Sequence, residues 1–99
     1  MLTMNIENIN TISKEEIPML DFTNEEVLNS RDEIEHRKQL LLQSMVLGNT
    51  YHTKVVIIFE AGSGIYQVET TIWATTDDFV LLKGAVYLPI QCIHDVIIP

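Results

Sequence analysis

Hydrophobic and polar positions follow two different periods along this chain. Between residues 23 and 47, apolar side chains recur at the three- and four-residue spacing of a helix. From residue 50 onward, β-branched and aromatic residues alternate with polar ones, and six of the seven aromatic residues lie there. The pattern therefore predicts one helix followed by a β-rich half that supplies most of the hydrophobic core.

The segment from residue 23 to residue 47 is predicted to form the helix. Its apolar stripe consists of Val27, Ile34, Leu41, Leu42 and Met45. Opposite charges four residues apart, typical of a solvated face, are Arg31 with Glu35 and Glu33 with Arg37. A Thr or Ser three residues before a Glu forms a capping box, so the helix starts either near residue 24, at Thr23, or near residue 30, at Ser30. Gly48 and Asn49 supply the stop signal.

Five strands are predicted in the second half of the chain: Thr53–Glu60, Ile65–Thr76, Phe79–Lys83, Val86–Ile90 and Ile93–Ile98. Glycine and aspartate mark the turns, at Ala61–Gly64, at Asp77-Asp78 and at Gly84. The second strand is long, so we expect a strong bend in it. Pro89 marks a strand end or a sheet edge, because proline cannot donate to a β-ladder.

These elements predict an α+β fold that is mostly β. The expected architecture is an N-terminal helix plus a five-stranded, bent, antiparallel small barrel, because short connections make neighbours antiparallel and closure removes exposed edges. An open meander with the helix packed on one side is the alternative. Residues 23–99 would form this domain, and residues 1–22 an acidic mobile tail. The acidic and apolar segment 15–22 could instead become ordered on a partner.

The chain carries 14 acidic and 6 basic residues among 99, a net charge of −8. Nucleic acid and anionic membranes are therefore poor partners, and the basic surface of another protein is a better one. The longest apolar run, Val55–Phe59, is too short to span a membrane. Cys92 is the only cysteine, which excludes an internal disulfide and fits a reducing compartment. We therefore expect a single cytoplasmic domain.

Three segments share features with one family of small β-barrels. Val55-x-Ile57-x-Phe59-x-x-Gly62 is similar to the first signature of the Sm-like proteins. Thr75–Lys83 resembles the turn from the second to the third strand of Hfq, the bacterial RNA chaperone of that family, and Ile93–Pro99 resembles its final strand. The resemblance covers about residues 40–99. It implies an N-terminal helix followed by five strongly bent strands, in a fold that commonly forms rings.

The chain also departs from that family. The basic triplet that Hfq carries before its last strand is replaced by Pro89–Ile93, which has no basic residue, and the glycine of the bent strand by Thr70 or Thr71. Phe79, beside Asp77, matches an RNA-stacking position. An acidic barrel with an N-terminal helix also resembles Rof, a small bacterial protein that binds the transcription terminator Rho. RNA binding therefore does not follow from the resemblance.

Catalytic and metal-binding groups are sparse. Cys92 and His94 would share one face of a strand, but a zinc site needs four ligands, or three plus water, and a buried structural cysteine is favoured. Ser63, His94 and Asp95 are the residue types of a catalytic triad. The sequence around Ser63 has no nucleophile elbow, and Asp95, next to His94 in a strand, would point to the opposite face. We therefore expect no catalytic residue, no metal site and no cofactor.

Four aromatic side chains and one turn acid are the candidate binding residues: Trp73, Phe79, Tyr66, Tyr87 and Asp77. We favour burial of Trp73 beneath the helix, because most tryptophans are largely buried, over an exposed contact surface. Asp77 with Asp78 is interpreted as a solvated turn rather than a carboxylate dyad.

The leading functional hypothesis is a non-enzymatic binding or assembly module. It would contact a protein partner, such as a basic nucleic-acid-binding protein, or form a homo-oligomer through the edge of Ile93–Ile98. One alternative is an Sm-like RNA-binding regulator that stacks bases on Phe79 and holds phosphates with Lys54 or Lys83. A third, less favoured hypothesis is a small metal-dependent enzyme built around His94.

Overall fold

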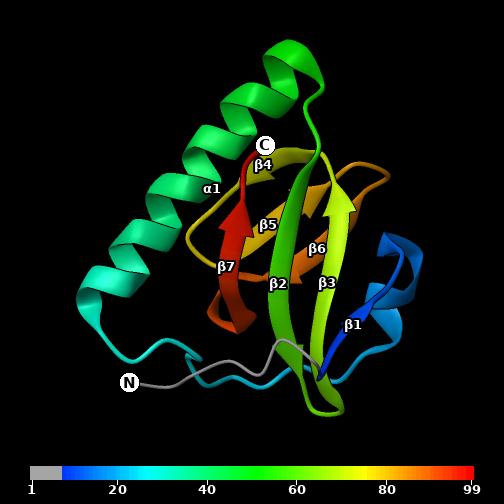
Figure 1. Ribbon diagram of the computed structural model, residues 1–99, viewed down its shortest axis with the longest axis vertical. Coiled ribbons are helices and arrows are strands. Elements are labelled where there is room, and N and C mark those ends of the chain that lie inside the picture. The colour runs from blue at the N-terminus through cyan, green and yellow to red at the C-terminus, as the bar shows by residue number, and fades with distance from the viewer. Residues whose placement is uncertain (1–7) are drawn as a thin grey trace.

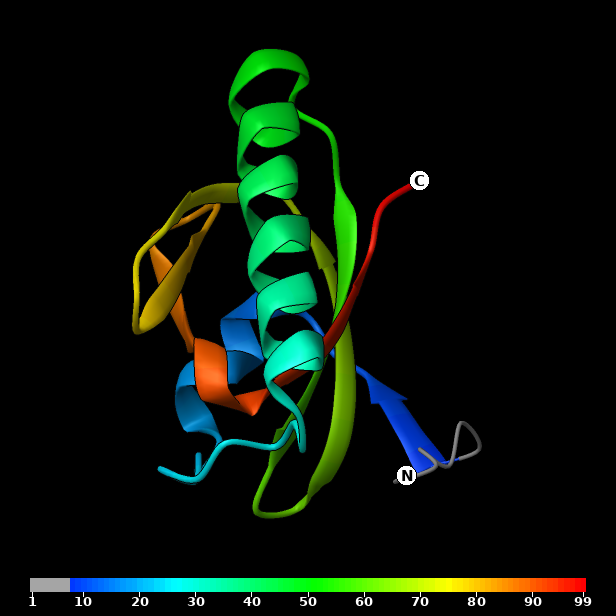
Figure 2. The same cartoon turned by 90° about the vertical axis from the view of Figure 1, so that its left-hand side faces the viewer.

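In residues 8–99, the part of the chain that the computed structural model describes, seven strands form two facing sheets and one long helix crosses the open side between them (Figures 1 and 2). The first sheet contains, in spatial order, β1 (Ile9–Thr11), β3 (Gly64–Thr70), β2 (Val55–Ala61) and β7 (Ile93–Ile97). The second contains β4 (Ile72–Thr75), β5 (Phe79–Leu82) and β6 (Val86–Pro89). The helix α1 spans Arg31–Tyr51, and the short 3₁₀ helices are η2 (Lys14–Met19) and η3 (Ile90–Cys92).

The long strand expected over residues 65–76 is divided between the two sheets. β3 ends at Thr70 and β4 begins at Ile72, so Thr71 alone separates them. Thr71 is buried, and its carbonyl accepts a hydrogen bond from the Lys83 N–H at 2.9 Å. The strong bend predicted for this strand is therefore the point at which the chain leaves one sheet for the other.

Two parts of the predicted architecture are wrong. Over residues 8–99 the sheets do not close into a barrel: β7 returns to pair antiparallel with β2, while β4, β5 and β6 form a separate sheet. The helix is not N-terminal either, because residues 8–30 precede it with ordered structure of their own. The coarser class is confirmed, since the fold is α+β and mostly β with one long helix.

Residues 8–22 pack against the sheets, whereas the sequence predicted a mobile tail over residues 1–22. β1 pairs with β3 in parallel, which a short local connection could not have produced. The short helix η2 buries Ile17 completely within the core. The remainder of the predicted tail, residues 1–7, lies outside the described residues.

One hydrophobic core fills the space between the two sheets. Its members are Ile17, Leu41, Val55, Ile57, Phe59, Val68, Ile72, Val80, Leu82, Leu88, Ile93 and Val96. Most of them lie on strands, as the sequence pattern predicted, and α1 contributes Leu41. Each large aliphatic side chain so buried stabilises the fold by about 1.5–3 kcal/mol. No helix within residues 8–99 is both long and apolar enough to cross a membrane.

The helix α1 begins at the later of the two starts that the sequence left open. Ser30 is the N-cap: its Oγ accepts from the Glu33 N–H at 3.1 Å and donates to the Glu33 carboxylate at 3.0 Å. The helix continues past the predicted stop at Gly48 and ends at Tyr51, where His52 adopts a left-handed backbone with φ 57°.

The inward face of α1 differs from the predicted apolar stripe. The buried positions are Arg37, Leu41, Ser44 and Gly48. Of the predicted stripe, Leu41 is buried, Met45 is half-buried, and Ile34 and Leu42 are 36% and 37% exposed. The C-terminal half of this face carries the small residues Ser44 and Gly48, which allow close contact with the sheet, and Ile34 and Leu42 lie at its margin.

At Gly48 the helix α1 lies close against the start of the second sheet. A Cβ at this position would lie 2.4 Å from the Ile72 carbonyl oxygen and 3.0 Å from Cγ2 of Thr71. Both atoms belong to the buried junction between β3 and β4, where the backbone cannot move away. Gly48 therefore acts as a contact residue inside the helix and not as its stop signal.

Replacing Gly48 with alanine is expected to destabilise the protein by about 1–3 kcal/mol, although alanine is the better helix former by about 1 kcal/mol. The added methyl group pushes α1 away from β4. The exposed variant Thr50→Ala is the matched control and should change the free energy of unfolding by less than about 0.5 kcal/mol. Chemical denaturation measures both. A Gly48→Ala protein as stable as the parent would contradict the close approach.

Candidate functional site

The outer face of the second sheet is apolar and aromatic. Along β5 and β6, alternate side chains point into the core, where Val80, Leu82 and Leu88 are fully buried. The side chains between them point outward: Phe79, Leu81, Tyr87 and Pro89, which we call the aromatic face. Phe79 is 44% exposed and Tyr87 61% exposed. Their ring centroids lie 6.1 Å apart at 85°, an edge-to-face pair.

Trp73 lies at the border between this face and α1. The register shifts from Ile72 opposite Leu82 to Ala74 opposite Leu81, so Trp73 is the extra residue of a β-bulge. Its side chain is 42% exposed, and the expectation that it would be buried beneath the helix is wrong. The Asn49 side chain on α1 donates to the Trp73 carbonyl at 3.2 Å, which joins the helix to the edge strand.

Tyr66 lies apart from the other candidate binding residues, on β3 in the first sheet. Its ring stacks on Phe59 with centroids 5.8 Å apart, and its hydroxyl lies 2.6 Å from Ser63 Oγ. The side chain is half-buried. These contacts give Tyr66 a role in packing the β2–β3 hairpin.

Asp77 lies in the turn between β4 and β5, as the sequence predicted for the pair with Asp78. Thr76 organises this turn: its Oγ accepts from the N–H groups of Asp78 and Phe79, and its own N–H donates to the Phe79 carbonyl at 2.8 Å. Asp77 is exposed. The turn therefore fixes the backbone without using the Asp77 carboxylate, which is left free at the surface.

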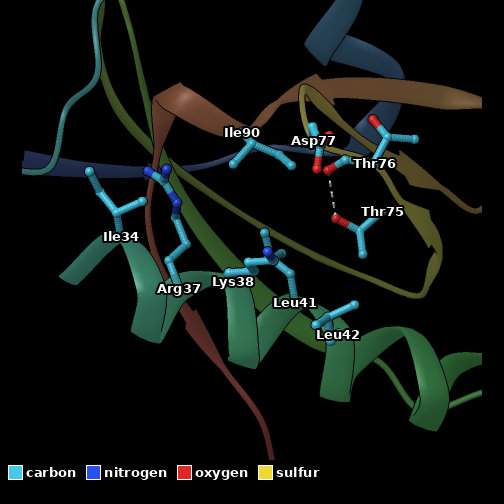
Figure 3. Close-up of a pocket in the computed structure, with 9 residues that line it drawn as sticks. All are labelled: Ile34, Arg37, Lys38, Leu41, Leu42, Thr75, Thr76, Asp77 and Ile90. Carbon is cyan, nitrogen blue, oxygen red and sulfur yellow. Dashed lines mark hydrogen bonds between the residues drawn. The ribbon is translucent and has the colours of Figure 1, made fainter. Parts of the chain in front are cut away.

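A pocket of about 210 Å³ opens between this turn and α1 (Figure 3). Its lining residues are Ile34, Arg37, Lys38, Leu41 and Leu42 on the helix, Thr75, Thr76 and Asp77 on the turn, and Ile90. The floor and walls are mainly aliphatic, and charged groups stand on both sides. Asp77 is the only one of the predicted binding residues that lines it.

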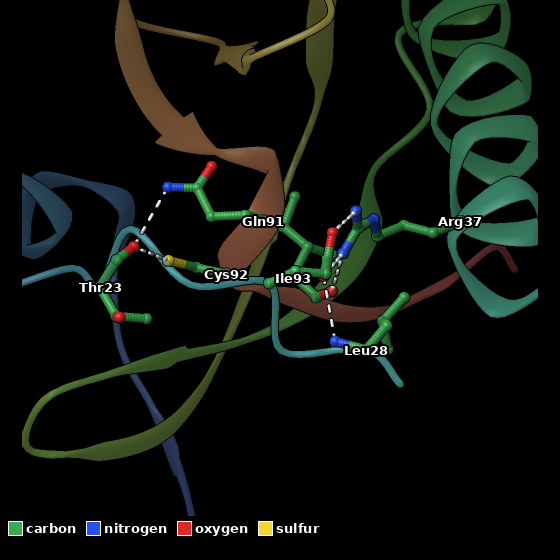
Figure 4. A network of polar contacts seen from close by, with 7 residues as sticks. Thr23, Leu28, Arg37, Gln91, Cys92 and Ile93 are labelled. Carbon is green, nitrogen blue, oxygen red and sulfur yellow. Dashed lines mark hydrogen bonds and ion pairs between the residues drawn. The ribbon is translucent and has the colours of Figure 1, made fainter. Parts of the chain in front are cut away.

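A polar network fastens the chain that precedes α1, residues 20–30, to the end of the second sheet (Figure 4). The Thr23 carbonyl accepts from the Gln91 side chain at 3.1 Å and from the Cys92 thiol at 3.4 Å. The Val27 N–H donates to the Gln91 carbonyl at 2.9 Å. Residues 20–30 are consequently held against η3.

Arg37 forms the second half of this network. Its Nη1 and Nη2 donate to the Glu26 carboxylate at 2.6 and 2.5 Å, and Nη1 also donates to the Ile93 carbonyl at 3.0 Å. Arg37 is only 4% exposed, and its Nε has no hydrogen-bond partner. The sequence analysis predicted that Arg37 forms a solvent-exposed ion pair with Glu33. That prediction is wrong, because the Arg37 side chain is buried and pairs with Glu26.

Two pKa values respond to this network. Partial burial raises the pKa of Glu26, but the hydrogen bonds and charge of Arg37 and the N–H of Leu28 outweigh it, so the pKa lies below its ordinary value. Burial raises the pKa of the Cys92 thiol, so that this side chain is held as a neutral donor to Thr23. Cys92 has the buried structural role that the sequence favoured.

The groups considered for catalysis are separated in the structure. Cys92 lies in η3 and not on the strand that carries His94. The His94 Nε2 lies 2.8 Å from Glu60, and Asp95 accepts from the Val96 N–H, so these two side chains do not pair with each other. Among residues 8–99, no three His, Cys, Asp or Glu side chains are placed to hold a metal ion.

Sequence reasoning missed Arg37 and the pocket. The signal that could have found Arg37 is its phase, since it shares the spacing of Leu41, Ser44 and Gly48 on one helix face. An arginine on the buried face of a helix needs a buried acceptor or an acidic partner, which Ile93 and Glu26 supply here. The pocket has no sequence signal of its own, because it forms where α1 and a distant turn fail to touch.

Glu26→Gln is expected to lower the free energy of unfolding at pH 7 by about 1.5–3 kcal/mol, because buried Arg37 loses its charged partner. The pKa of Glu26 is depressed in the folded state, so this stabilisation is present above the ordinary value of 4.5 and is lost as the pH falls through the folded pKa. The exposed variant Glu25→Gln is the matched control. Denaturation at pH 7 and pH 3 checks this, and an equal deficit of Glu26→Gln at both pH values contradicts the ion-pair account.

Comparison with protein-family models, with curated proteins and with solved structures found no match to this chain. The candidate surfaces are therefore interpreted from their own geometry and chemistry.

Proposed function

We propose that this protein is a non-enzymatic binding module that contacts a protein partner through its aromatic face. The observation that carries this proposal is the exposed edge-to-face pair of Phe79 and Tyr87, which stands on the side of the second sheet opposite the core. Exposed apolar patches mark interaction sites, and tyrosine and other aromatic residues are enriched at the energetic centres of protein interfaces.

The distribution of charge on this protein favours a partner with a basic surface. The aromatic face itself has no charged member, whereas the chain as a whole carries a net charge of −8. Asp77 and Asp78 stand at the turn that adjoins Phe79. An apolar centre with acids at its border favours a partner surface in which an apolar patch is surrounded by Lys and Arg, and the overall field steers such a partner inward.

Self-association is the second form of this proposal. β6 and β7 are outer strands of their sheets, and Ile97 on β7 is 49% exposed. An outer strand offers unpaired backbone groups to a strand from another chain. The relationship to the Sm-like family, expected from the sequence, remains a proposal supported by the bent strand over residues 64–75 and by the antiparallel neighbours β4, β5 and β6.

RNA binding is less well supported than protein binding. Lys54 precedes Val55, the partner of Thr70, and the Lys83 N–H bonds to Thr71, so both lysines belong to the same end of the molecule. Phe79 lies at the opposite end of β5 from Lys83. A base stacked on Phe79 would therefore not place its phosphate beside either lysine.

The double variant Phe79→Ser/Tyr87→Ser is expected to recover at least about ten-fold less partner from native cell extract than the parent, because it removes the two anchors of the interface. Tyr51→Ser, which removes an exposed aromatic residue at the end of α1, is the matched control and should recover the parental amount. Quantitative mass spectrometry measures recovery, and thermal unfolding confirms that both variants fold.

Equal recovery by the double variant and the parent would overturn the aromatic face as the binding site. Filter binding to RNA at two salt concentrations tests the RNA-binding alternative. Tight binding at low salt that weakens steeply with added salt would support it, because that salt dependence is the signature of phosphate contacts. Light scattering at high concentration tests self-association, which a strictly monomeric protein would contradict.

A further inference from the structure

The pocket between α1 and the β4–β5 turn has a charge composition opposite to that of the whole chain. Of the chain's 6 basic residues, Arg37 and Lys38 line it, and of the 14 acidic residues, Asp77 does. The aliphatic side chains of Ile34, Leu41, Leu42 and Ile90 form the rest of the surface apart from two threonines. The charge of Arg37 is paired with Glu26, which leaves Lys38 and Asp77 as the two lining charges that make no ion pair within residues 8–99.

The cavity exists because α1 is fixed to the sheets at two separate points. At Gly48 the helix backbone lies against the Ile72 carbonyl, and at Arg37 the helix is tied to Ile93 and Glu26. Between these points the helix passes the β4–β5 turn without reaching it, and the space is left open (Figure 3). Because α1 is held at both contacts, the pocket is already open in this structure, and a ligand does not need to move the helix.

The charged groups of the pocket stand on different walls. Lys38 rises from α1, and Asp77 lies on the turn across the opening (Figure 3). Lys38 makes no ion pair within residues 8–99, where Arg37 pairs with Glu26 and the His94 Nε2 lies 2.8 Å from the Glu60 carboxylate. Arg37 adds a buried guanidinium whose Nε has no hydrogen-bond partner. Because Glu26 pairs the charge of Arg37, the Lys38 ammonium is the positive charge that the helix side of the cavity offers to a ligand.

We propose that this pocket binds a small monocarboxylate with an aliphatic chain. The chain would lie on the surface of Leu41, Leu42 and Ile90, and the carboxylate would face the Lys38 ammonium, away from Asp77. Ligand pockets are typically about 300–1,000 Å³, so a cavity of about 210 Å³ takes a molecule of short-chain size. This proposal does not depend on the aromatic face, which lies on the other side of the turn.

Titration of the ¹⁵N-labelled protein with hexanoate, followed by NMR, tests the proposal. Saturable shifts are expected at residues around Lys38, Leu42 and Thr76, with a dissociation constant on the order of 1 mM. The neutral analogue 1-hexanol should bind about three- to five-fold more weakly, because it cannot pair with Lys38.

Two substitutions should change the affinity in opposite directions. Lys38→Gln removes the attraction and should weaken hexanoate binding about three- to five-fold, while Asp77→Asn removes a repulsion and should strengthen it about two-fold. Asparagine is as common in turns as aspartate, so Asp77→Asn should preserve the backbone conformation of the β4–β5 turn. Lys54→Gln, an exposed lysine outside the pocket, is the matched control and should bind hexanoate like the parent.

Three results would overturn the assignment. Absence of saturable shifts excludes the ligand, and an unchanged affinity of Lys38→Gln excludes the proposed orientation. Equal affinity for hexanoate and 1-hexanol shows that the pocket accepts only an apolar group, as a seat for a side chain of a partner protein would.

Discussion

The buried guanidinium of Arg37 is the interaction on which the arrangement of this molecule depends. It reaches from the N-terminal third of α1 to the Ile93 carbonyl at the start of β7 and to the Glu26 carboxylate in the chain before the helix. A buried arginine is tolerated when its charge is paired and most of its donors are used. Glu26 pairs the charge of Arg37 and, with the Ile93 carbonyl, accepts from Nη1 and Nη2, whereas Nε has no partner. With this tie at one end and the backbone contact of Gly48 at the other, α1 has a fixed position across both sheets.

The two candidate surfaces follow from that fixed helix. Because α1 and η2 cover the core from its open sides, the second sheet needs only its inner face for stability, and the outer face is free to carry Phe79 and Tyr87. Because the helix is held at two points, the space beside the β4–β5 turn stays open. In the function that we propose, the acidic surface would favour basic proteins over nucleic acids as partners. The core therefore uses the inner face of the second sheet, and the proposed recognition would use its outer face.

The sequence predicted the local elements better than their assembly. The turn at Asp77-Asp78 and four of the five predicted strands depend on neighbouring residues and are found, and Ser30 is one of the two helix starts that the sequence left open. The predicted strand over residues 65–76 is divided at Thr71. Closure of the sheets, the parallel pairing of β1 and the burial of Ile17 depend on contacts between distant segments, which periodicity does not encode. Arg37 and Gly48 were misinterpreted for a related reason: a charge usually indicates solvent and a glycine usually indicates a helix end. Phe79 and Tyr87 were named as candidate binding residues, and both are exposed, but their role in binding stays a prediction; Trp73 was expected to be buried and is not.

Residue-resolved hydrogen exchange under native conditions tests most directly whether α1 and the two sheets form one cooperative unit. The account predicts that amides of α1 between Leu41 and Gly48 exchange with the same opening free energy as those of β2 between Val55 and Phe59, namely that of global unfolding. Exchange of the α1 amides through a local opening that leaves β2 protected would contradict it, because a helix held by Arg37 and Gly48 cannot detach alone.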